Sequence, residues 1–392
     1  MPKVSTQSTL FRVDGDPSTA AGPYVPILLI KQGERQALER IDVETRHGIT
    51  PWLRVVPPEL AREDGSDVPP DEIRRFARAT EGHAVYLDVA GAPRRQISSP
   101  RLGSAYITSI FETALDAGLS FLPVYPFGRP DLASTIAAYE SPASGGAVLV
   151  RANALLVFGA GSFARNLDME VNGLGIDPSR LDVMLDLGYI DAGASDPSSE
   201  VRLVRQLADA FAWRSIIVSG SSVPDSFAGE VPDGSVGWVR RHEKAIFDSF
   251  PDRIGRLRFG DHGVQHEVAP RPGYAAGMRA NIRYTSGDYL YVSRSLRPVR
   301  EIDRDRLPGE YQAVAARLTQ GAPFAGSTCC WGDQFLLSLV DGSRRAKGQH
   351  WMRAAATCHH LTIVARERAQ PAPASPPPLT TRDRMTLLAP RR

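Results

Sequence analysis

The chain repeats one pattern eight times: a short apolar run, a turn, an amphipathic stretch, and then the next apolar run. The eight runs lie at residues 24–30, 49–56, 83–89, 119–124, 147–151, 181–187, 215–218 and 256–259, with starts 25 to 41 residues apart. That interval accommodates a strand, a helix and two loops, and continuous apolar runs are typical of parallel strands covered on both faces. Eight units favour a closed (β/α)8 TIM-like barrel, because closure leaves no exposed sheet edge. An open doubly wound sheet is the alternative, although no G-x-G-x-x-G motif follows the first run.

The regions between and after these runs predict helices and a second unit. Amphipathic spacing indicates helices at 34–44, 100–117, 200–213 and 236–250. Beyond Gly273, strand-like segments at 281–285 and 289–293 precede a helix at 308–319 and elements at 332–340 and 351–366, the last changing from helix to strand at 361–364. We therefore expect a flexible arm at 1–22, the barrel at 23–272, a mixed α/β module packed on the barrel at 273–369, and a disordered Pro-rich tail at 370–392.

Charge and hydropathy narrow the classes of partner. The 392 residues include 46 basic and 44 acidic side chains, a net charge of +2 that gives no global attraction to nucleic acid or membrane. No run of 18 apolar residues offers a membrane span, and the first twenty residues lack the apolar centre of a secretory signal. We expect a cytoplasmic protein without a membrane partner.

Positive side chains follow several of the predicted strands at their carboxyl ends, where barrels of this kind place their sites. Lys31, Arg54 and Arg151 would suit a small anionic ligand that carries phosphate or carboxylate groups. After the seventh run, residues 219–221, which are Ser219, Gly220 and Ser221, could form a backbone cradle for phosphate. The alternative is that these charges pair with acidic neighbours and hold the mouth of the barrel together.

Acidic side chains are expected at the same end of the barrel. Glu34, Asp88 and Asp186 are candidate general acid/base residues, and Asp261 is a further candidate ligand-binding residue beside His262. The same carboxylates could hold a divalent metal, but no motif specifies one.

The last quarter of the chain is rich in side chains that bind soft metals. These are Cys329, Cys330, His350, Cys358, His359 and His360. The adjacent Cys-Cys and His-His pairs lack the two-residue gap usual in zinc sites, so buried cysteines are the favoured interpretation and no metal site is assigned. A second hypothesis is that the module folds over the barrel mouth and contributes ligand-binding side chains there: Asp333, Arg353, His359 and His360.

Aromatic residues of the module, among them Tyr284, Trp331 and Trp351, could stack on nucleic-acid bases beside Arg283. A packed second core explains the same residues and is preferred.

Short motifs spread along the chain resemble the phage-type "beta family" proteins. They are YVPIL at 24–28, KQGE at 31–34, AL at 37–38, ITP at 49–51, DLGY at 186–189, RYT at 283–285, WGD at 331–333, HWMR at 350–353 and HHLT at 359–362. The resemblance covers residues 24–369 and implies a setting in phages, mobile elements or antiviral defence, with no settled activity.

Three functional hypotheses follow. The first is a barrel enzyme acting on an anionic, phosphorylated or nucleotide-like ligand. The second is a non-catalytic component of a phage or defence system that recognises nucleic acid or a partner protein. The third is a metal-dependent hydrolase or nuclease that uses the carboxylates.

Overall fold

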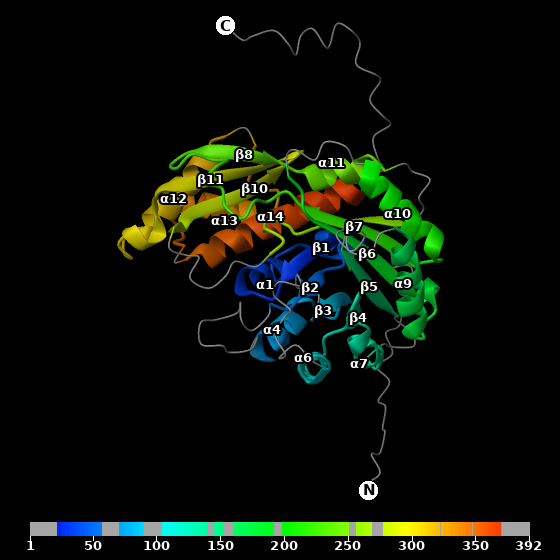
Figure 1. Ribbon diagram of the computed structural model, residues 1–392. Coiled ribbons are helices and arrows are strands. Elements are labelled where there is room, and N and C mark those ends of the chain that lie inside the picture. Colours follow the sequence, from blue (N-terminus) through cyan, green and yellow to red (C-terminus); the bar gives the residue numbers. More distant parts are fainter. Residues whose placement is uncertain are drawn as a thin grey trace, which may run out of the picture.

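The computed structural model describes residues 22–56, 70–89, 104–139, 145–151, 160–191, 198–250, 256–268, 277–321, 323–346 and 348–369. Eight parallel strands pair in sequence and close into a barrel, because the first strand also pairs with the last (Figure 1). The strands are β1 (Tyr24–Leu29), β2 (Trp52–Arg54), β3 (Val85–Asp88), β4 (Phe121–Pro126), β5 (Gly146–Arg151), β6 (Leu181–Tyr189), β7 (Ser215–Ser221) and β9 (Leu257–Asp261). The predicted barrel is confirmed, and each strand overlaps one of the eight apolar runs. The predicted tail at 370–392 and the predicted arm at 1–22, except for Gly22, lie outside the described residues.

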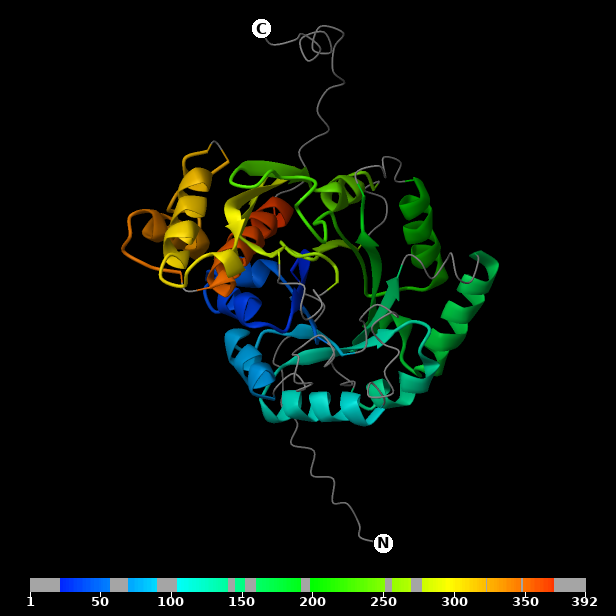
Figure 2. The same cartoon turned by 60° about the vertical axis from the view of Figure 1, so that its left-hand side comes forward.

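Helices surround the strands, as Figure 2 shows. They are α1 (Gln32–Leu38), α2 (Val43–Gly48), α4 (Pro70–Ala79), α6 (Ser104–Asp116), α7 (Ala133–Ala137), α9 (Ala160–Gly173), α10 (Ser198–Ala210) and α11 (His242–Asp248), with 3-10 turns at Pro130–Leu132 and Pro178–Arg180. The predicted helix at 34–44 is divided in two. The second piece, α2, begins where the Asp42 side chain accepts a hydrogen bond from the Thr45 amide (2.7 Å), which satisfies a free N–H at the helix start.

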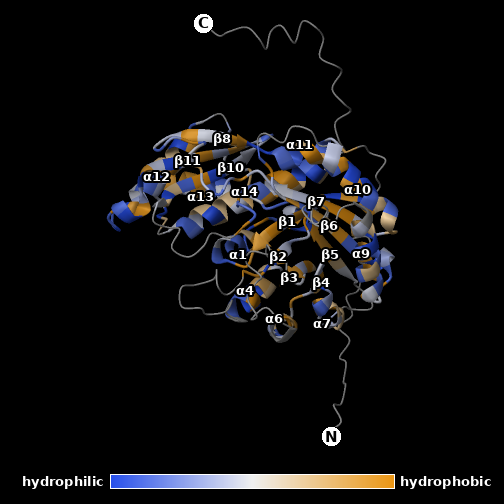
Figure 3. Ribbon diagram, viewed as in Figure 1, coloured by the Kyte–Doolittle hydropathy of each residue, from blue (hydrophilic) through white to orange (hydrophobic). Residues whose placement is uncertain are grey.

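Alternating side chains of the strands fill the barrel interior in layers. Apolar inward residues such as Trp52, Tyr86 and Met184 pack against one another in the middle of the barrel. The outward residues of the same strands pack against the helices in a larger core, and the strands are strongly hydrophobic in Figure 3. Asp182 and Asp186 lie in β6 two residues before and two residues after Met184, and both are also buried. The period of two along a strand therefore gives the barrel a polar layer at each end of its apolar centre.

A three-stranded antiparallel sheet forms beside the barrel. It has the order β10 (Arg279–Ser286), β11 (Tyr289–Pro298) and β8 (Val236–Arg240). With α12 (Leu307–Thr319) and α13 (Trp331–Val340) it encloses a second hydrophobic core. The predicted helix at 236–250 is wrong in its first part, because 236–240 pairs with β11 and only His242–Asp248 is helical.

The last helix, α14 (Gln349–Ala369), belongs to both units. It is helical throughout, so the predicted strand at 361–364 is wrong; these residues lie on the buried side of the helix. The helix packs against α1, α2 and β1, and at its end Arg368 lies over Phe247 and Phe259, with its centre 4.3 Å from the latter ring. Thus α14 lies between α11 and α1, where a barrel's eighth helix is expected, and the module between β9 and α14 is joined to the barrel through it.

None of the helices in the described part of the chain is long and apolar enough to cross a membrane.

Candidate functional site

Asp186 is the centre of a buried ion-pair network at the carboxyl end of the barrel. Its Oδ2 lies 3.4 Å from Arg54 Nη2 and 3.3 Å from Arg151 Nη1, while its Oδ1 lies 3.2 Å from His262 Nε2. Burial alone would raise the pKa of Asp186, but His262, Arg151 and Arg54 hold it well below its usual value. The carboxylate is therefore ionised and already engaged by three basic side chains.

Arg54 extends this network to Asp88. Its Nε donates to Asp88 Oδ2 at 3.0 Å, and Trp52 Nε1 donates to the same oxygen at 3.0 Å. Burial lowers the pKa of Arg54, but the two carboxylates outweigh this effect and raise it. The alternative of charges that pair across the barrel mouth accounts for Arg54, Asp88 and Asp186, because each is almost fully buried and has an opposite charge beside it.

The predicted phosphate cradle does not form as expected. Ser219, Gly220 and Ser221 belong to β7 itself and are not a loop after it. Ser219 Oγ lies 3.5 Å from Asp186, and Ser221 Oγ donates to the carbonyl of Gln265 at 3.0 Å. These residues are held in the sheet and their hydroxyls are used within it, so they do not present a ring of free N–H groups.

A cavity of about 590 Å³ lies where the barrel meets the module. Its wall includes the segments that follow β7 and β9, the strands β10 and β11, and the first turns of α14. Four arginines line it: Arg279, Arg283, Arg294 and Arg353. Two of these share one counter-charge, because Arg279 Nη2 and Arg294 Nη2 both contact the carboxylate of Asp233.

The other two arginines belong to a cluster with an excess of positive charge. Arg283 and Arg353 lie near Lys31 and Glu34, and Glu34 is the acidic residue whose charge acts on all three cations. Burial and the charge of Arg353 lower the pKa of Arg283 to about 9, and the same two causes lower the pKa of Lys31. Within the described residues, neither the Lys31 ammonium nor the Arg353 guanidinium makes a hydrogen bond or an ion pair, although the Lys31 backbone N–H donates to the Leu29 carbonyl at 2.7 Å.

Glu34 lies directly behind the cavity wall. It is 0% exposed, and its Oε1 accepts a 3.1 Å hydrogen bond from Gln265, which does line the cavity. Its Oε2 is buried without a hydrogen-bond partner in the described part of the chain. Burial raises the pKa of Glu34 against the opposing effect of Arg353 and Lys31. This carboxyl group is therefore more readily protonated than an exposed one.

Local packing explains why Arg353 points to this cluster. Gly33, in the first turn of α1, faces the Arg353 stem on α14, and a Cβ at this position would lie 2.9 Å from Arg353 Cδ and 3.0 Å from its Cβ. The missing side chain of Gly33 lets the two helices approach closely.

A second network joins α14 to strands β1 and β9 of the barrel. Asp261 accepts a 2.6 Å hydrogen bond from the Tyr24 hydroxyl and lies 3.0 Å from His360 Nε2. His360 Nδ1 is 2.6 Å from the Thr285 hydroxyl on β10. His360, Tyr24 and the neighbouring Arg241 outweigh burial and lower the pKa of Asp261. Because all these groups are buried, Asp261 and His360 fasten the module to the barrel.

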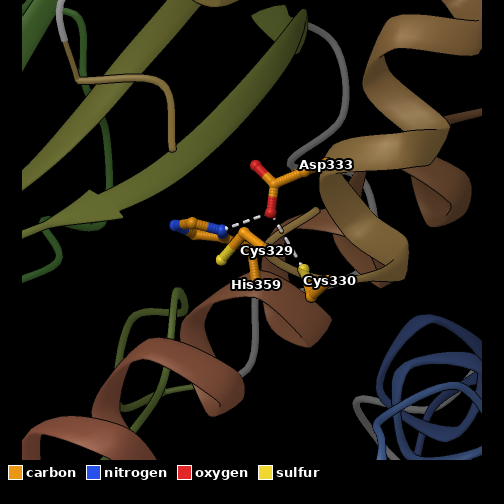
Figure 4. A group of neighbouring side chains, drawn as sticks. All are labelled: Cys329, Cys330, Asp333 and His359. Carbon is orange, nitrogen blue, oxygen red and sulfur yellow. Dashed lines mark hydrogen bonds and ion pairs between the residues drawn. The ribbon is translucent and has the colours of Figure 1, made fainter. Parts of the chain in front are cut away.

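The four residues that were expected to cover the barrel mouth therefore do not lie together. Arg353 lines the cavity and His360 contacts Asp261, but Asp333 and His359 lie in the interior of the module. There His359 Nδ1 is 2.9 Å from Asp333 Oδ2, beside Cys329 and Cys330 (Figure 4). Tyr284 is fully buried and stacks on His359 with ring centroids 3.8 Å apart, as expected of a packed core.

The three predicted cations do not all meet. Arg54 and Arg151 share Asp186, whereas the charged neighbours of Lys31 are Glu34 and Arg353. The sequence interpretation missed Arg279 as a cavity residue. Arg279, Asn281 and Arg283 alternate along β10 and all line the cavity, so a period of two in polar residues was the available signal.

The comparisons with known proteins agree with the sequence resemblance. A family model described as Beta protein matches residues 24–366. No curated protein matches the sequence significantly. Among solved structures, the chain is similar to the triosephosphate isomerase of Bartonella henselae, with 8% identity, coverage of 60% of this chain and 90% of that chain, and a TM-score of 0.27. Because this TM-score is low, the barrel assignment rests on the strand pairing and not on this likeness.

Proposed function

The chain belongs to the Beta protein family, and we propose that this member is a barrel enzyme that binds a small anionic ligand in the cavity between barrel and module. The observation that carries the proposal is the excess of positive charge at one wall, where Lys31, Arg283 and Arg353 all interact with the carboxyl group of Glu34. Asp225 is a further acidic residue of the cavity lining. The ligand class is a phosphorylated or nucleotide-like molecule.

Electrostatics favours an anion at this wall. A buried cation without a counter-charge is costly, and the lowered pKa values of Lys31 and Arg283 express that cost. A phosphate or carboxylate group would offset it, and a guanidinium can donate two parallel hydrogen bonds to such a group. The cavity volume of about 590 Å³ lies within the range of about 300–1,000 Å³ that is usual for small-molecule sites.

Glu34 is the group we assign to proton transfer. It is next to the cavity wall, its pKa is raised by burial, and one of its oxygens has no partner among the described residues. A carboxyl group with a raised pKa keeps its proton to a higher pH than an exposed one and can deliver it to a bound anion or leaving group. The other two acid/base candidates, Asp88 and Asp186, are not assigned this role, because their carboxylates are paired with Arg54.

The same pairing is the reason that we do not propose a metal-dependent hydrolase at the barrel mouth. A divalent ion would have to displace arginines from Asp88 and Asp186. The setting in phages or antiviral defence, which the family resemblance implies, stays a prediction.

A melting-temperature screen tests the proposal. The purified full chain is heated with phosphate, pyrophosphate, nucleoside phosphates, sugar phosphates and citrate, at constant ionic strength. Arg353→Gln is compared with Arg306→Gln, because Arg306 is on the surface with 81% of its side chain exposed. We expect at least one anion to raise the melting temperature of wild type and Arg306→Gln but not of Arg353→Gln. No shift with any anion, or equal shifts in all three proteins, would refute it.

A further inference from the structure

Four side chains that are distant from the cavity gather inside the module. Cys329 and Cys330 come directly before α13, Asp333 is in its first turn, and His359 is on α14. Figure 4 shows their side chains turned toward one another. One potential ligand atom from each of the four lies within 4.8 Å of all the others. Three of the four residues are buried, and Cys329 is partly buried.

We propose that these four residues form a structural zinc site that joins α13 to α14. Zinc in proteins binds Cys sulfur at about 2.3 Å and His or carboxylate atoms at about 2.0–2.2 Å, which places tetrahedral ligand atoms roughly 3.3–3.8 Å apart. Cys330 Sγ and His359 Nδ1 lie 3.0 Å and 2.9 Å from Asp333 Oδ2, slightly closer than this range, and all four ligand atoms lie within 4.8 Å of one another. Small side-chain movements would open a central position for the ion.

The outer contacts of the cluster are those of a metal site. His359 Nε2 is 2.8 Å from the carbonyl oxygen of Thr285, to which it can donate, and this bond leaves Nδ1 as the nitrogen that faces the cluster. Tyr284 donates to Asp333 Oδ1 at 2.6 Å, so that Oδ2 is the oxygen directed inward. A histidine bonded to a backbone carbonyl and a hydrogen-bonded carboxylate are the usual supports of zinc ligands, because they fix the tautomer and the orientation.

Charge also fits a divalent ion. Two thiolates and one carboxylate would carry three negative charges, which zinc reduces to one. Arg366 lies on the outer side, with Nη1 3.8 Å from Cys329 Sγ and Nη2 3.3 Å from the Cys329 carbonyl oxygen. Cys330 is the N-cap residue of α13 and its thiol donates a hydrogen bond to Asp333 Oδ2, so zinc binding would displace the proton of this thiol. With four protein ligands the site would be closed, which is characteristic of a structural rather than a catalytic ion.

The absence of a two-residue gap between Cys329 and Cys330 therefore does not decide against a site. The extended backbone at Cys330 (φ −159°, ψ 176°) and the start of α13 bring both thiols to the same carboxylate. Among the other soft ligands of this region, His360 turns instead to Asp261. Cys358 Sγ lies 3.9 Å from the Arg40 carbonyl oxygen, and its thiol borders the cluster on the side of Cys330.

Metal analysis of the full chain, purified without chelator, tests the inference. We expect about one zinc per chain in wild type and in His350→Gln, which serves as the control because His350 is a partly buried histidine of α14 that does not belong to the cluster. Zinc content should fall at least tenfold in Cys330→Ser and in His359→Gln. Cobalt(II) added to metal-free wild type should give a thiolate-to-cobalt charge-transfer band and the intense visible absorption of tetrahedral cobalt, and the wild-type result stands even if a variant fails to fold.

Three results would overturn the inference. Wild type could contain no zinc and give no charge-transfer band with cobalt. Zinc could be retained in both Cys330→Ser and His359→Gln, which would place it elsewhere. Mass spectrometry of the metal-free protein could show a disulfide between Cys329 and Cys330, and the protein could still fail to bind zinc after that disulfide is reduced.

Discussion

Replacing Arg54 by methionine removes the guanidinium that joins Asp88 to Asp186 inside the barrel. Breaking a buried ion pair from one side typically costs about 3–5 kcal/mol, because it leaves a buried charge without compensation. Here the cost should fall at the lower end, near 3 kcal/mol, since Asp186 keeps Arg151 and His262 and Asp88 keeps the Trp52 N–H.

Scanning calorimetry measures this cost as a lower melting temperature. With an unfolding entropy of about 2.1 cal/mol/K per residue, a loss of about 3 kcal/mol in a chain of 392 residues lowers the melting temperature by roughly 3–4 °C. Arg306→Met is the control, because its partner Asp303 is 3.7 Å away and both side chains are about 80% exposed; such a pair contributes about 0–1 kcal/mol. If Arg54→Met melted like this control, the ion-pair network would not stabilise the barrel and the reasoning would fail.

Three further changes test other parts of the structure. Glu34→Gln should gain stability relative to wild type as the pH rises from about 4 toward neutrality. Burial holds the folded-state pKa of Glu34 above its unfolded value, so wild type loses stability across that interval. Urea unfolding at several pH values would show a constant difference between the two proteins if this were wrong. Tyr24→Phe should lower the free energy of unfolding by about 1–2 kcal/mol, since the hydroxyl donates to buried Asp261, and an unchanged urea midpoint would contradict it. Gly33→Ala should displace Arg353 and weaken anion binding by about 1 kcal/mol, roughly fivefold; calorimetric titration with the anion found in the screen decides, and unaltered affinity would exclude that role for Gly33.

The barrel could be predicted from the sequence because its strands are covered on both faces. Each strand then has to be a nearly continuous apolar run, and the eight runs mark the eight barrel strands, β1 to β7 and β9, to within a few residues. The polar ends of the strands could also be placed, since Arg54, Asp88 and Asp186 interrupt apolar runs near their carboxyl ends.

The pairing of those polar residues could not be predicted, because it depends on the stagger of the strands. Lys31 and Arg54 both follow strands at the same end of the barrel, yet Lys31 meets Arg353 from α14 and Arg54 meets Asp186 from β6. The strand β8 was missed for a related reason. Its residues 236–240 are only partly buried, and what makes them a strand is their pairing with β11, some 50 residues later.

Helix α14 shows a second limit of prediction from the local sequence pattern. The apolar segment at 361–364 was interpreted as a strand, but it is the part of the helix that packs against the barrel. The cluster of Cys329, Cys330, Asp333 and His359 depends on the same helix, because His359 reaches the two thiols only after α14 folds back along α13. Tertiary packing determines contacts between residues this far apart in the sequence, and the spacing of residues along the chain does not reveal them.

The position of a bound anion tests the central proposal most directly. Crystals of the full chain soaked in selenate, whose selenium scatters anomalously, would locate the ion without any assumption about the natural ligand. The proposal predicts an anomalous peak in the cavity within hydrogen-bonding distance of Arg283 and Arg353, and no such peak in crystals of Arg353→Gln. Selenate bound at other surfaces while this cavity stays free of it, in crystals whose contacts leave the cavity open, would contradict the proposal.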